Sequence, residues 1–188
     1  MRSLEKEEVM KLLALIGSPR KGGNTDLLVE EIIRGSSLPE EETSKVYLYD
    51  LNFSSCVDCR TCVKEPHECA LKDDLQQVYP LLEKAQVIIF GTPLYWFAPT
   101  GPMKALIDRL RPFYYSRRLE GKGALLIMPS AEGEKACTYA KGMFELTFSY
   151  LGLRPLGFLF PMAYEKGEVA RKPETLRAAR ELGRALFL

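Results

Sequence analysis

The amino-acid sequence predicts an α/β protein built around a mostly parallel sheet. Short apolar runs alternate with longer segments of helical period, which is the order of elements in α/β folds. The first, third and fourth of these runs are apolar almost throughout, as in strands that helices cover on both faces. We therefore expect a three-layer sandwich with helices on each side of one sheet.

Five strands and five helices are expected, so that each strand is followed by a helix. The strands lie at 11–16, 45–49, 86–90, 124–128 and, with a weaker pattern, 156–160. The helices lie at 24–34, 73–84, 101–109, 134–151 and 173–187. Asn24 or Thr25 can cap the first helix, and Asp73 and Asp74 place carboxylates at the positive end of the second.

The composition fits one compact domain over residues 1–188, with a cysteine-rich loop at 51–71 as its longest irregular piece. Of 188 residues, 46% are hydrophobic and 27% are charged, which suffices for a single core and excludes a disordered chain. The formal net charge of +1 lacks the one-sided electrostatics of a dedicated nucleic-acid binder. No nucleic-acid partner is therefore expected.

The apolar runs are too short to anchor the chain in a membrane. The longest, such as 12–16 and 124–128, fall far short of the roughly 20 residues that a membrane helix needs. The charged start of the chain, with acidic residues at positions 5, 7 and 8, lacks the form of a secretory signal. We expect a cytoplasmic protein with no membrane partner.

The glycine-rich loop 17–25 (GSPRKGGNT) lies between the first strand and the first helix, where backbone N–H groups and a helix N-terminus can bind an anion. It lacks the lysine of a Walker A loop and the G-x-G-x-x-G pattern of dinucleotide-binding loops. A phosphate is the expected guest, and a plain turn between strand and helix is the alternative. The candidate phosphate ligands are Ser18, Arg20, Gly23, Asn24 and Thr25.

A second loop, 91–102 (GTPLYWFAPTGP), follows the third strand and would lie beside the first in a sheet of strand order 2-1-3-4-5. Its three consecutive aromatics, Tyr95, Trp96 and Phe97, cannot all pack inward from a regular element. At least one is expected to be exposed or covered by a ligand or a second subunit. A planar ring could rest here, although a small hydrophobic cluster would also explain the aromatics.

Together these two loops resemble those of the NADPH-dependent FMN reductase family of flavodoxin-like proteins, and the resemblance extends over about residues 12–157. It implies a flavodoxin-like fold and bound FMN, with the phosphate on the first loop and no catalytic acid or base. It further implies a homodimer or homotetramer with the flavin near a subunit interface. The implied contacts of the isoalloxazine are Pro93, Leu94, Tyr95, Trp96 and Phe97, together with Ser130, Glu132 and Gly133 from the loop after the fourth strand.

Four of the five cysteines fall in the loop 51–71 with the spacing C-x2-C-x2-C-x6-C. Four thiolates are the number that a 4Fe-4S cluster requires, and the motif resembles that of the iron-sulfur flavoprotein branch of the same group. Reduced or transiently disulfide-bonded thiols and a zinc site remain open alternatives. The candidate metal ligands are Cys56, Cys59, Cys62 and Cys69.

The predicted function is that of an FMN-dependent oxidoreductase that moves electrons between a 4Fe-4S cluster or NAD(P)H and FMN, and on to a small acceptor. Ferredoxin is an expected partner if the cluster exists. One alternative is an FMN-only, NAD(P)H-dependent FMN or quinone reductase with reduced thiols. The others are an electron carrier without enzyme activity, which the charge of +1 disfavours, and a zinc-binding scaffold.

Overall fold

The computed structural model describes residues 11–187, and their central element is a five-stranded parallel sheet of order β2-β1-β3-β6-β7. Since β6 and β7 are the fourth and fifth strands of this sheet along the chain, the predicted strand order is confirmed. The strands are β1 (Leu12–Ile16), β2 (Thr43–Tyr47), β3 (Val87–Gly91), β6 (Gly123–Ile127) and β7 (Arg154–Leu159).

The edge strands depart from the predicted ranges more than the central ones do. Strand β2 begins and ends two residues before the expected range 45–49, because Leu48–Asp50 forms a 3-10 turn in which the N–H of Leu51 donates to the carbonyl of Leu48. Every residue of β1, β3 and β6 is buried, whereas β2 and β7 are partly exposed. An edge strand is covered less completely, so its apolar pattern is weaker.

The helices correspond to the predicted ones with two differences. They are α1 (Asn24–Ser36), α2 (Val78–Lys84), α3 (Gly101–Asp108), α4 (Arg111–Ser116), α5 (Thr138–Leu151) and α6 (Pro173–Arg184). The expected helices 73–84 and 134–151 each begin with 3-10 turns, Asp74–Gln77 and Gly133–Cys137. Helix α4 and the two-residue strands β4 (Leu94–Tyr95) and β5 (Ala98–Pro99) were not predicted.

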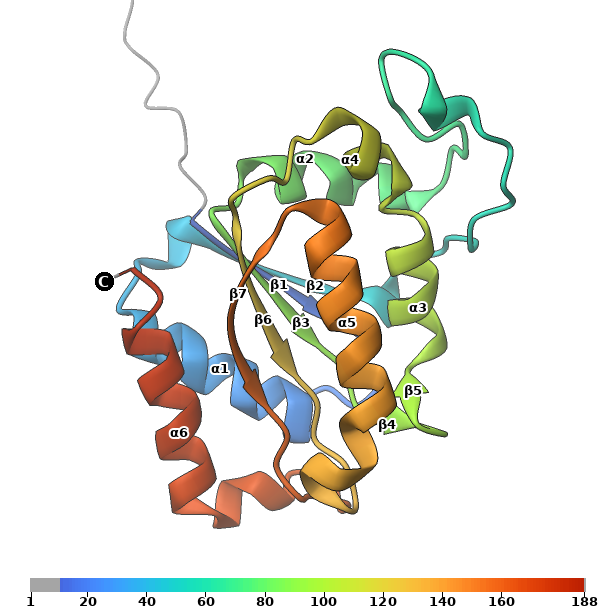
Figure 1. The fold of residues 1–188 in the computed structure, drawn as a ribbon. Coiled ribbons are helices and arrows are strands. Elements are labelled where there is room, and N and C mark those ends of the chain that lie inside the picture. The colour runs from blue at the N-terminus through green and yellow to red at the C-terminus, as the bar shows by residue number, and fades with distance from the viewer. Residues whose placement is uncertain (1–10, 188) are drawn as a thin grey trace, which may run out of the picture.

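Helices cover both faces of the sheet, as Figure 1 shows, with α1 and α6 on one side and α2 to α5 on the other. Alternate residues of β1 supply the two cores: Leu13 and Leu15 pack with α2 to α5, and Leu12, Ala14 and Ile16 pack with α1 and α6. The expected three-layer sandwich is thereby confirmed.

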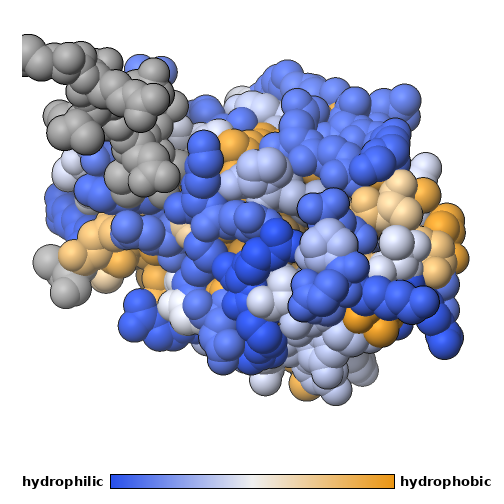
Figure 2. Space-filling model, turned by 90° about the horizontal axis from the view of Figure 1, so that it is seen from above, coloured by the Kyte–Doolittle hydropathy of each residue, from blue (hydrophilic) through white to orange (hydrophobic). Residues whose placement is uncertain are grey.

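The loops that follow β1, β3, β6 and β7 lie at one end of the molecule, near β4 and β5, whereas the cysteine loop projects beyond α3 and α4 at the other end (Figure 1). Figure 2 looks down on this second end. Hydrophilic side chains dominate the view, and apolar ones show in several separate patches, one of them on the side where Figure 1 draws the cysteine loop. Among residues 11–187, no helix combines the length and apolarity needed to cross a bilayer.

Candidate functional site

A cavity of about 230 Å³ opens at the edge of the sheet where the strands end. Four loops wall it, those after β1, β3, β6 and β7, so every wall begins at the carboxyl end of a strand. Ligands of open α/β sheets bind at this edge. The lining residues are Ser18, Arg20, Asn24, Thr25, Pro93, Leu94, Tyr95, Pro129, Ser130, Ala131, Ala163, Tyr164 and Lys166.

The first wall is the loop 17–25, whose shape is fixed by its glycines and by a buried carboxylate. Gly22 has φ +68°, and a Cβ on Gly23 would lie 2.7 Å from the carbonyl oxygen of Arg20. Asp26 is buried and accepts hydrogen bonds from the N–H of Gly22 at 2.7 Å and from the hydroxyl of Tyr47 at 2.9 Å. The loop is therefore held in one conformation at the start of α1.

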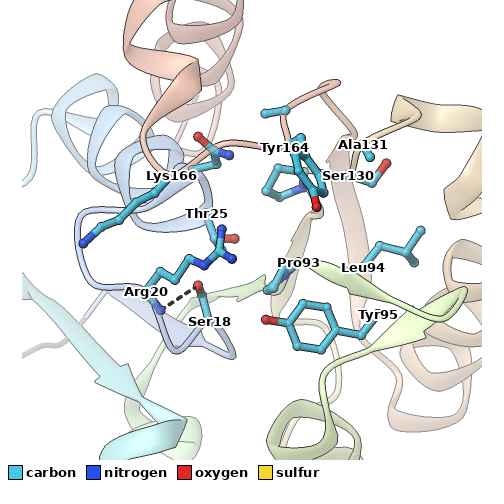
Figure 3. A pocket seen from close by; sticks show the side chains of 13 residues that line it. Ser18, Arg20, Thr25, Pro93, Leu94, Tyr95, Ser130, Ala131, Tyr164 and Lys166 are labelled. Carbon is cyan, nitrogen blue, oxygen red and sulfur yellow. Dashed lines mark hydrogen bonds between the residues drawn. The ribbon is translucent and has the colours of Figure 1, made fainter.

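Polar side chains of this loop face the cavity. Ser18 and Thr25 are buried, and the Ser18 hydroxyl accepts from the N–H of Arg20 at 3.2 Å. The Arg20 side chain points into the cavity between Thr25 and Pro93 (Figure 3). With the N-terminus of α1 beside them, these groups form an arrangement suited to a phosphate.

Asn24 lines the cavity, but its side-chain amide is already engaged with the loop after β7. Its Nδ2 donates to the carbonyl of Glu165 at 2.8 Å, and its Oδ1 accepts from the N–H of Val169 at 3.2 Å. Asn24 thus joins two walls of the cavity. Gly23 contributes no side chain, and its N–H donates to the carbonyl of Arg20.

Two buried threonines connect the loop after β3 to the other walls. The Thr100 hydroxyl donates to the carbonyl of Gly17 at 2.7 Å, while its N–H donates to the Thr92 hydroxyl at 3.2 Å. The N–H of Leu94 donates to the carbonyl of Pro129 at 3.4 Å. These bonds cross-link the first three walls and fix their spacing.

The aromatic triplet divides between the cavity and the solvent. Tyr95 lines the cavity together with Pro93 and Leu94, whereas Trp96 and Phe97 form the turn of the β4–β5 hairpin with φ of 48° and 63°. Trp96 is 94% exposed and Phe97 is 56% exposed. Neither belongs to the cavity lining in this single chain.

From the loop after β6, only Ser130 of the three predicted residues lines the cavity, together with Pro129 and Ala131. The Ser130 hydroxyl donates to the carbonyl of Gly133 at 3.0 Å, and Glu132 is exposed. Both Gly133 and Glu132 lie outside the lining.

The fourth wall, with Ala163, Tyr164 and Lys166, was missed by the sequence reasoning. The N–H of Ala163 donates to the carbonyl of Ser130 at 2.7 Å, which ties this wall to the third. Figure 3 shows the rings of Tyr95 and Tyr164 on opposite sides of Pro93. The signal was the expected strand 156–160, since the loop after it must reach the same edge of a parallel sheet.

All four cysteines of the loop line a second, smaller hollow of about 20 Å³, next to Arg109 and Arg111. Three of the sulfurs accept hydrogen bonds: Cys56 from the N–H of Asp58 at 3.4 Å, Cys59 from the Thr61 hydroxyl at 3.5 Å, and Cys69 from Nε of Arg109 at 3.2 Å.

The four cysteines are free thiols, and their environments differ. The hydrogen bond from Thr61 lowers the pKa of the exposed Cys59, whereas burial raises that of Cys62. Within residues 11–187, no three His, Cys, Asp or Glu side chains are close enough together to hold one metal ion. The loop therefore gathers the thiols around one hollow without closing them into a cage of ligands.

Arg109 connects the cysteine loop to the core. Its side chain is 1% exposed and forms two hydrogen bonds with the Asp73 carboxylate, at 2.7 and 3.1 Å. Asp73 also accepts from the N–H of Leu75, as its predicted capping role requires, but the ion pair was not predicted. The guanidinium holds the pKa of the Asp73 carboxyl below its usual value. Burial and the neighbouring Cys69 thiol raise the pKa of the Tyr79 hydroxyl.

The chain is similar to known flavoproteins over most of its length. The model of the NADPH-dependent FMN reductase family matches residues 10–162. An iron-sulfur flavoprotein of Methanocaldococcus jannaschii is 34% identical over 131 residues, which are 69% of this chain and 67% of that protein. One from Archaeoglobus fulgidus is 28% identical over 175 residues, covering 93% of this chain and 77% of the relative.

A Bacillus subtilis protein whose name describes an NAD(P)H-dependent FMN-containing oxidoreductase is 27% identical over 185 residues, covering 92% of this chain and 96% of that one. Two solved structures share the fold. A flavodoxin, WrbA-like protein from Agrobacterium tumefaciens gives a TM-score of 0.61 at 17% identity, covering 94% of each chain. An NAD(P)H:quinone oxidoreductase from Methanothermobacter marburgensis gives 0.69 at 20% identity, covering 95% of this chain and 96% of that one. The fold is thus flavodoxin-like.

Proposed function

Because this chain belongs to the NADPH-dependent FMN reductase family and is an FMN-dependent oxidoreductase, we propose that its four-walled cavity is the FMN site and that its cysteine loop carries a second redox centre. The observation that carries the first part is the meeting of a phosphate-type loop and a loop suited to a planar ring in one cavity. NAD(P)H or the second centre would supply electrons, and a small molecule would accept them.

In this proposal the FMN phosphate lies against the loop 17–25. Ser18, Thr25 and the N-terminus of α1 supply hydrogen-bond donors there, and Arg20 supplies the positive charge. Asn24 acts chiefly by positioning, because its amide already bonds Glu165 and Val169. The isoalloxazine would lie along Pro93, Leu94 and Tyr95. FMN provides the electron and hydride chemistry when bound, so the chain must bind, orient and shield it, without a catalytic acid or base.

We propose further that Cys56, Cys59, Cys62 and Cys69 hold a 4Fe-4S cluster. The donor set suits that group, because four thiols line one hollow and three of their sulfurs already accept hydrogen bonds. Two arginines at the same hollow, Arg109 and Arg111, offset the negative charge of a cluster with four thiolate ligands. Two of the relatives are named iron-sulfur flavoproteins, which supports the same proposal.

An FMN-only reductase that uses NAD(P)H directly is the second candidate. It is favoured by the separation of the thiols, since no three of the metal-binding side chains among residues 11–187 come together in this structure. The Bacillus subtilis relative, named for NAD(P)H and FMN alone, fits this candidate. Under it the thiols of the loop would remain reduced or take part in disulfide chemistry.

We propose that the hairpin tip packs against a second copy of the chain in a homodimer or homotetramer. Trp96 and Phe97 expose large apolar surfaces at the margin of the cavity, and such patches mark interaction sites. Trp96 is the only tryptophan, so its fluorescence reports directly on this contact. Emission typical of a buried indole in the oligomer, and a shift toward that of an exposed indole on dilution to monomers, would support the proposal. A monomer at all concentrations would contradict it.

The experiment that tests the function is the visible spectrum of protein purified without oxygen, with iron and acid-labile sulfide analysis. Flavin bands near roughly 375 and 450 nm are expected, with broad absorption around 400 nm and about four irons per chain. Flavin without iron would favour the FMN-only reductase. NAD(P)H oxidation with a quinone or free flavin, and electron uptake from reduced ferredoxin, then separate the two candidates from a carrier without turnover.

Substitution of single cysteines sharpens this test. Cys59→Ala should abolish iron binding and leave the FMN spectrum in place, because the hollow and the cavity are separate. Cys137→Ala is the matched control, since Cys137 is a buried cysteine of the core outside the loop. Full iron content in Cys59→Ala would contradict the proposed ligand set.

A further inference from the structure

Cys69 differs from the other three cysteines of the loop because a buried charged group binds its sulfur. Nε of Arg109 donates to the Cys69 Sγ at 3.2 Å, and the Arg109 side chain is 1% exposed. By contrast, Cys56 and Cys59 accept from Asp58 and Thr61 within the loop itself. Of the three sulfurs that accept hydrogen bonds, that of Cys69 is the one bonded to a buried residue from outside the loop.

The guanidinium is fixed in orientation by its remaining donors. Nη1 donates to the carbonyl of Ser54 at 2.8 Å and to Asp73 at 2.7 Å, and Nη2 donates to Asp73 at 3.1 Å. Asp73 is held in turn by the N–H groups of Leu75 and Ser54. With both Nη groups engaged, the Nε proton is the one directed at the sulfur.

The backbone of Cys69 is fixed as well. The side-chain amide of Gln76 donates to the carbonyls of Cys69 at 3.0 Å and of Leu71 at 2.7 Å. Cys69 is thus held both at its backbone and at its sulfur.

Burying an ion pair is a poor route to stability, because the desolvation of both charges offsets most of their attraction. Stability alone therefore does not explain why the buried Arg109 guanidinium donates to the Cys69 sulfur. Reduction of an iron-sulfur cluster adds one negative charge, and a nearby positive charge that donates to a ligand sulfur stabilises that charge. Hydrogen bonds to the sulfurs are among the factors that set cluster potentials.

We infer that Arg109 is a positioning residue of the second redox centre, which fixes Cys69 as a ligand and raises the reduction potential of the cluster. This inference rests on the proposed cluster at the four cysteines. Arg109 and the cysteines line the same hollow, so the charge acts at the centre itself. Arg111 lines the hollow too, but it pairs with Asp58, and no hydrogen bond joins it to a sulfur among the described residues.

The test is a redox titration of the cluster, followed by its absorbance, in anaerobically purified wild type, Arg109→Gln and Arg111→Gln. The equilibrium constant for one-electron reduction should fall at least tenfold in Arg109→Gln, a shift of about 59 mV to more negative potential. Arg111→Gln removes an equal charge from the same hollow and should shift the potential less. If Arg109 only stabilised the fold, its substitution would lower the unfolding free energy, and the reduction potentials of the Arg109 and Arg111 variants would not differ.

Two further variants keep the test decisive if Arg109→Gln does not fold. Arg109→Lys retains the charge but loses the planar fork, so its potential should lie below that of wild type and of Arg111→Lys. Asp73→Asn removes the anion that offsets the guanidinium and should shift the potential in the positive direction. Potentials in all the Arg109 and Asp73 variants no further from wild type than those of the Arg111 controls would overturn the inference.

Iron analysis separates this failure from failure of the proposed function. Wild-type protein that holds flavin but no iron or sulfide would contradict the cluster itself. Wild-type protein with about four irons per chain, and an unchanged potential in the Arg109 variants, would contradict only the role of Arg109.

Discussion

The two ends of α3 carry two sites that are attached to the fold in different ways. At its N-terminal end, the walls of the flavin cavity start directly from four strands, and Thr100 bonds one wall to another. At its C-terminal end, the cysteines lie on a loop with one short 3-10 turn, Thr61–Val63, and Arg109 reaches this loop from the core. The eight residues of α3 separate the sites by about 12 Å along the helix.

These two modes of attachment predict how each site responds to substitution. Several independent backbone bonds hold the flavin cavity, so the loss of one side chain should weaken a contact without dispersing the walls. At the cysteine hollow, one buried guanidinium contacts Ser54, Cys69 and Asp73 together, so its loss removes several bonds at once. Substitutions at the two ends should therefore have effects of unequal size.

The largest expected effect is that of Arg109→Met on stability. It removes the guanidinium from the Asp73 carboxylate and the Ser54 carbonyl, and because the carboxylate is 17% exposed we expect a cost of about 3 kcal/mol, at the lower end for buried ion pairs. Urea unfolding of the cluster-free protein measures the change. Arg111→Met, at an exposed pair with Asp58, is the control and should leave the midpoint nearly unchanged. Equal losses of unfolding free energy in the two variants would mean that the Arg109–Asp73 pair contributes no more to stability than the exposed Arg111–Asp58 pair.

The next effect is that of Arg20→Ala on FMN affinity. The loss of a hydrogen bond to a charged group should weaken binding by about 1.5–3 kcal/mol, or roughly 10- to 150-fold in Kd. Quenching of flavin fluorescence on titration measures it. Lys21→Ala is the matched control, because Lys21 is the next residue, pairs with Asp50 and lies outside the cavity lining. Unchanged affinity in Arg20→Ala would exclude Arg20 from the phosphate site.

A smaller effect is expected from Thr100→Val. Valine keeps the volume but leaves the Gly17 carbonyl without the Thr100 hydroxyl, at a cost of about 1–2 kcal/mol in unfolding free energy. FMN affinity should fall along with it, because this bond sets the spacing of the first two walls. Thr147→Val removes a hydroxyl that donates within α5 and should change neither quantity. Lower stability with unchanged affinity would mean that the other cross-links suffice to place the walls.

The sequence was sufficient for the parts of the fold that follow from local pattern. The continuous apolar runs of β1, β3 and β6 predicted a covered parallel sheet, and the loops after β1 and β3 pointed to its functional edge. The strand β7 was predicted at 156–160, but the loop after it was not singled out as part of the site. Its lining residues Tyr164 and Lys166 belong to no glycine-rich or aromatic motif of the kind that marked the loops after β1 and β3.

The attachment of the cysteine loop could not be read from the sequence for a different reason. Arg109 and Asp73 are 36 positions apart, and each has an ordinary local explanation, as a charged residue at a helix end and as a helix cap. Their pairing exists only because α3 brings Arg109 beneath the loop. Similarly, Trp96 and Phe97 have positive φ because they form a two-residue hairpin turn, and this turn lacks the glycine by which such turns are predicted from sequence.

The smallest expected effect is the pH dependence that Asp73 contributes. Arg109 holds the folded pKa of this carboxyl below its usual value of about 3.9, so its stabilising contribution is complete above that pH and is lost as the pH falls through the folded pKa. The difference in unfolding free energy between wild type and Asp73→Asn should therefore be largest near neutral pH and narrow below about pH 4. Urea unfolding at intervals from neutral to acidic pH measures it. In the Arg109→Met background the narrowing should be smaller, because only the N–H groups of Ser54 and Leu75 remain to lower the pKa of the Asp73 carboxyl. A difference that stays constant with pH in the wild-type background would mean that folding does not lower the pKa of the Asp73 carboxyl.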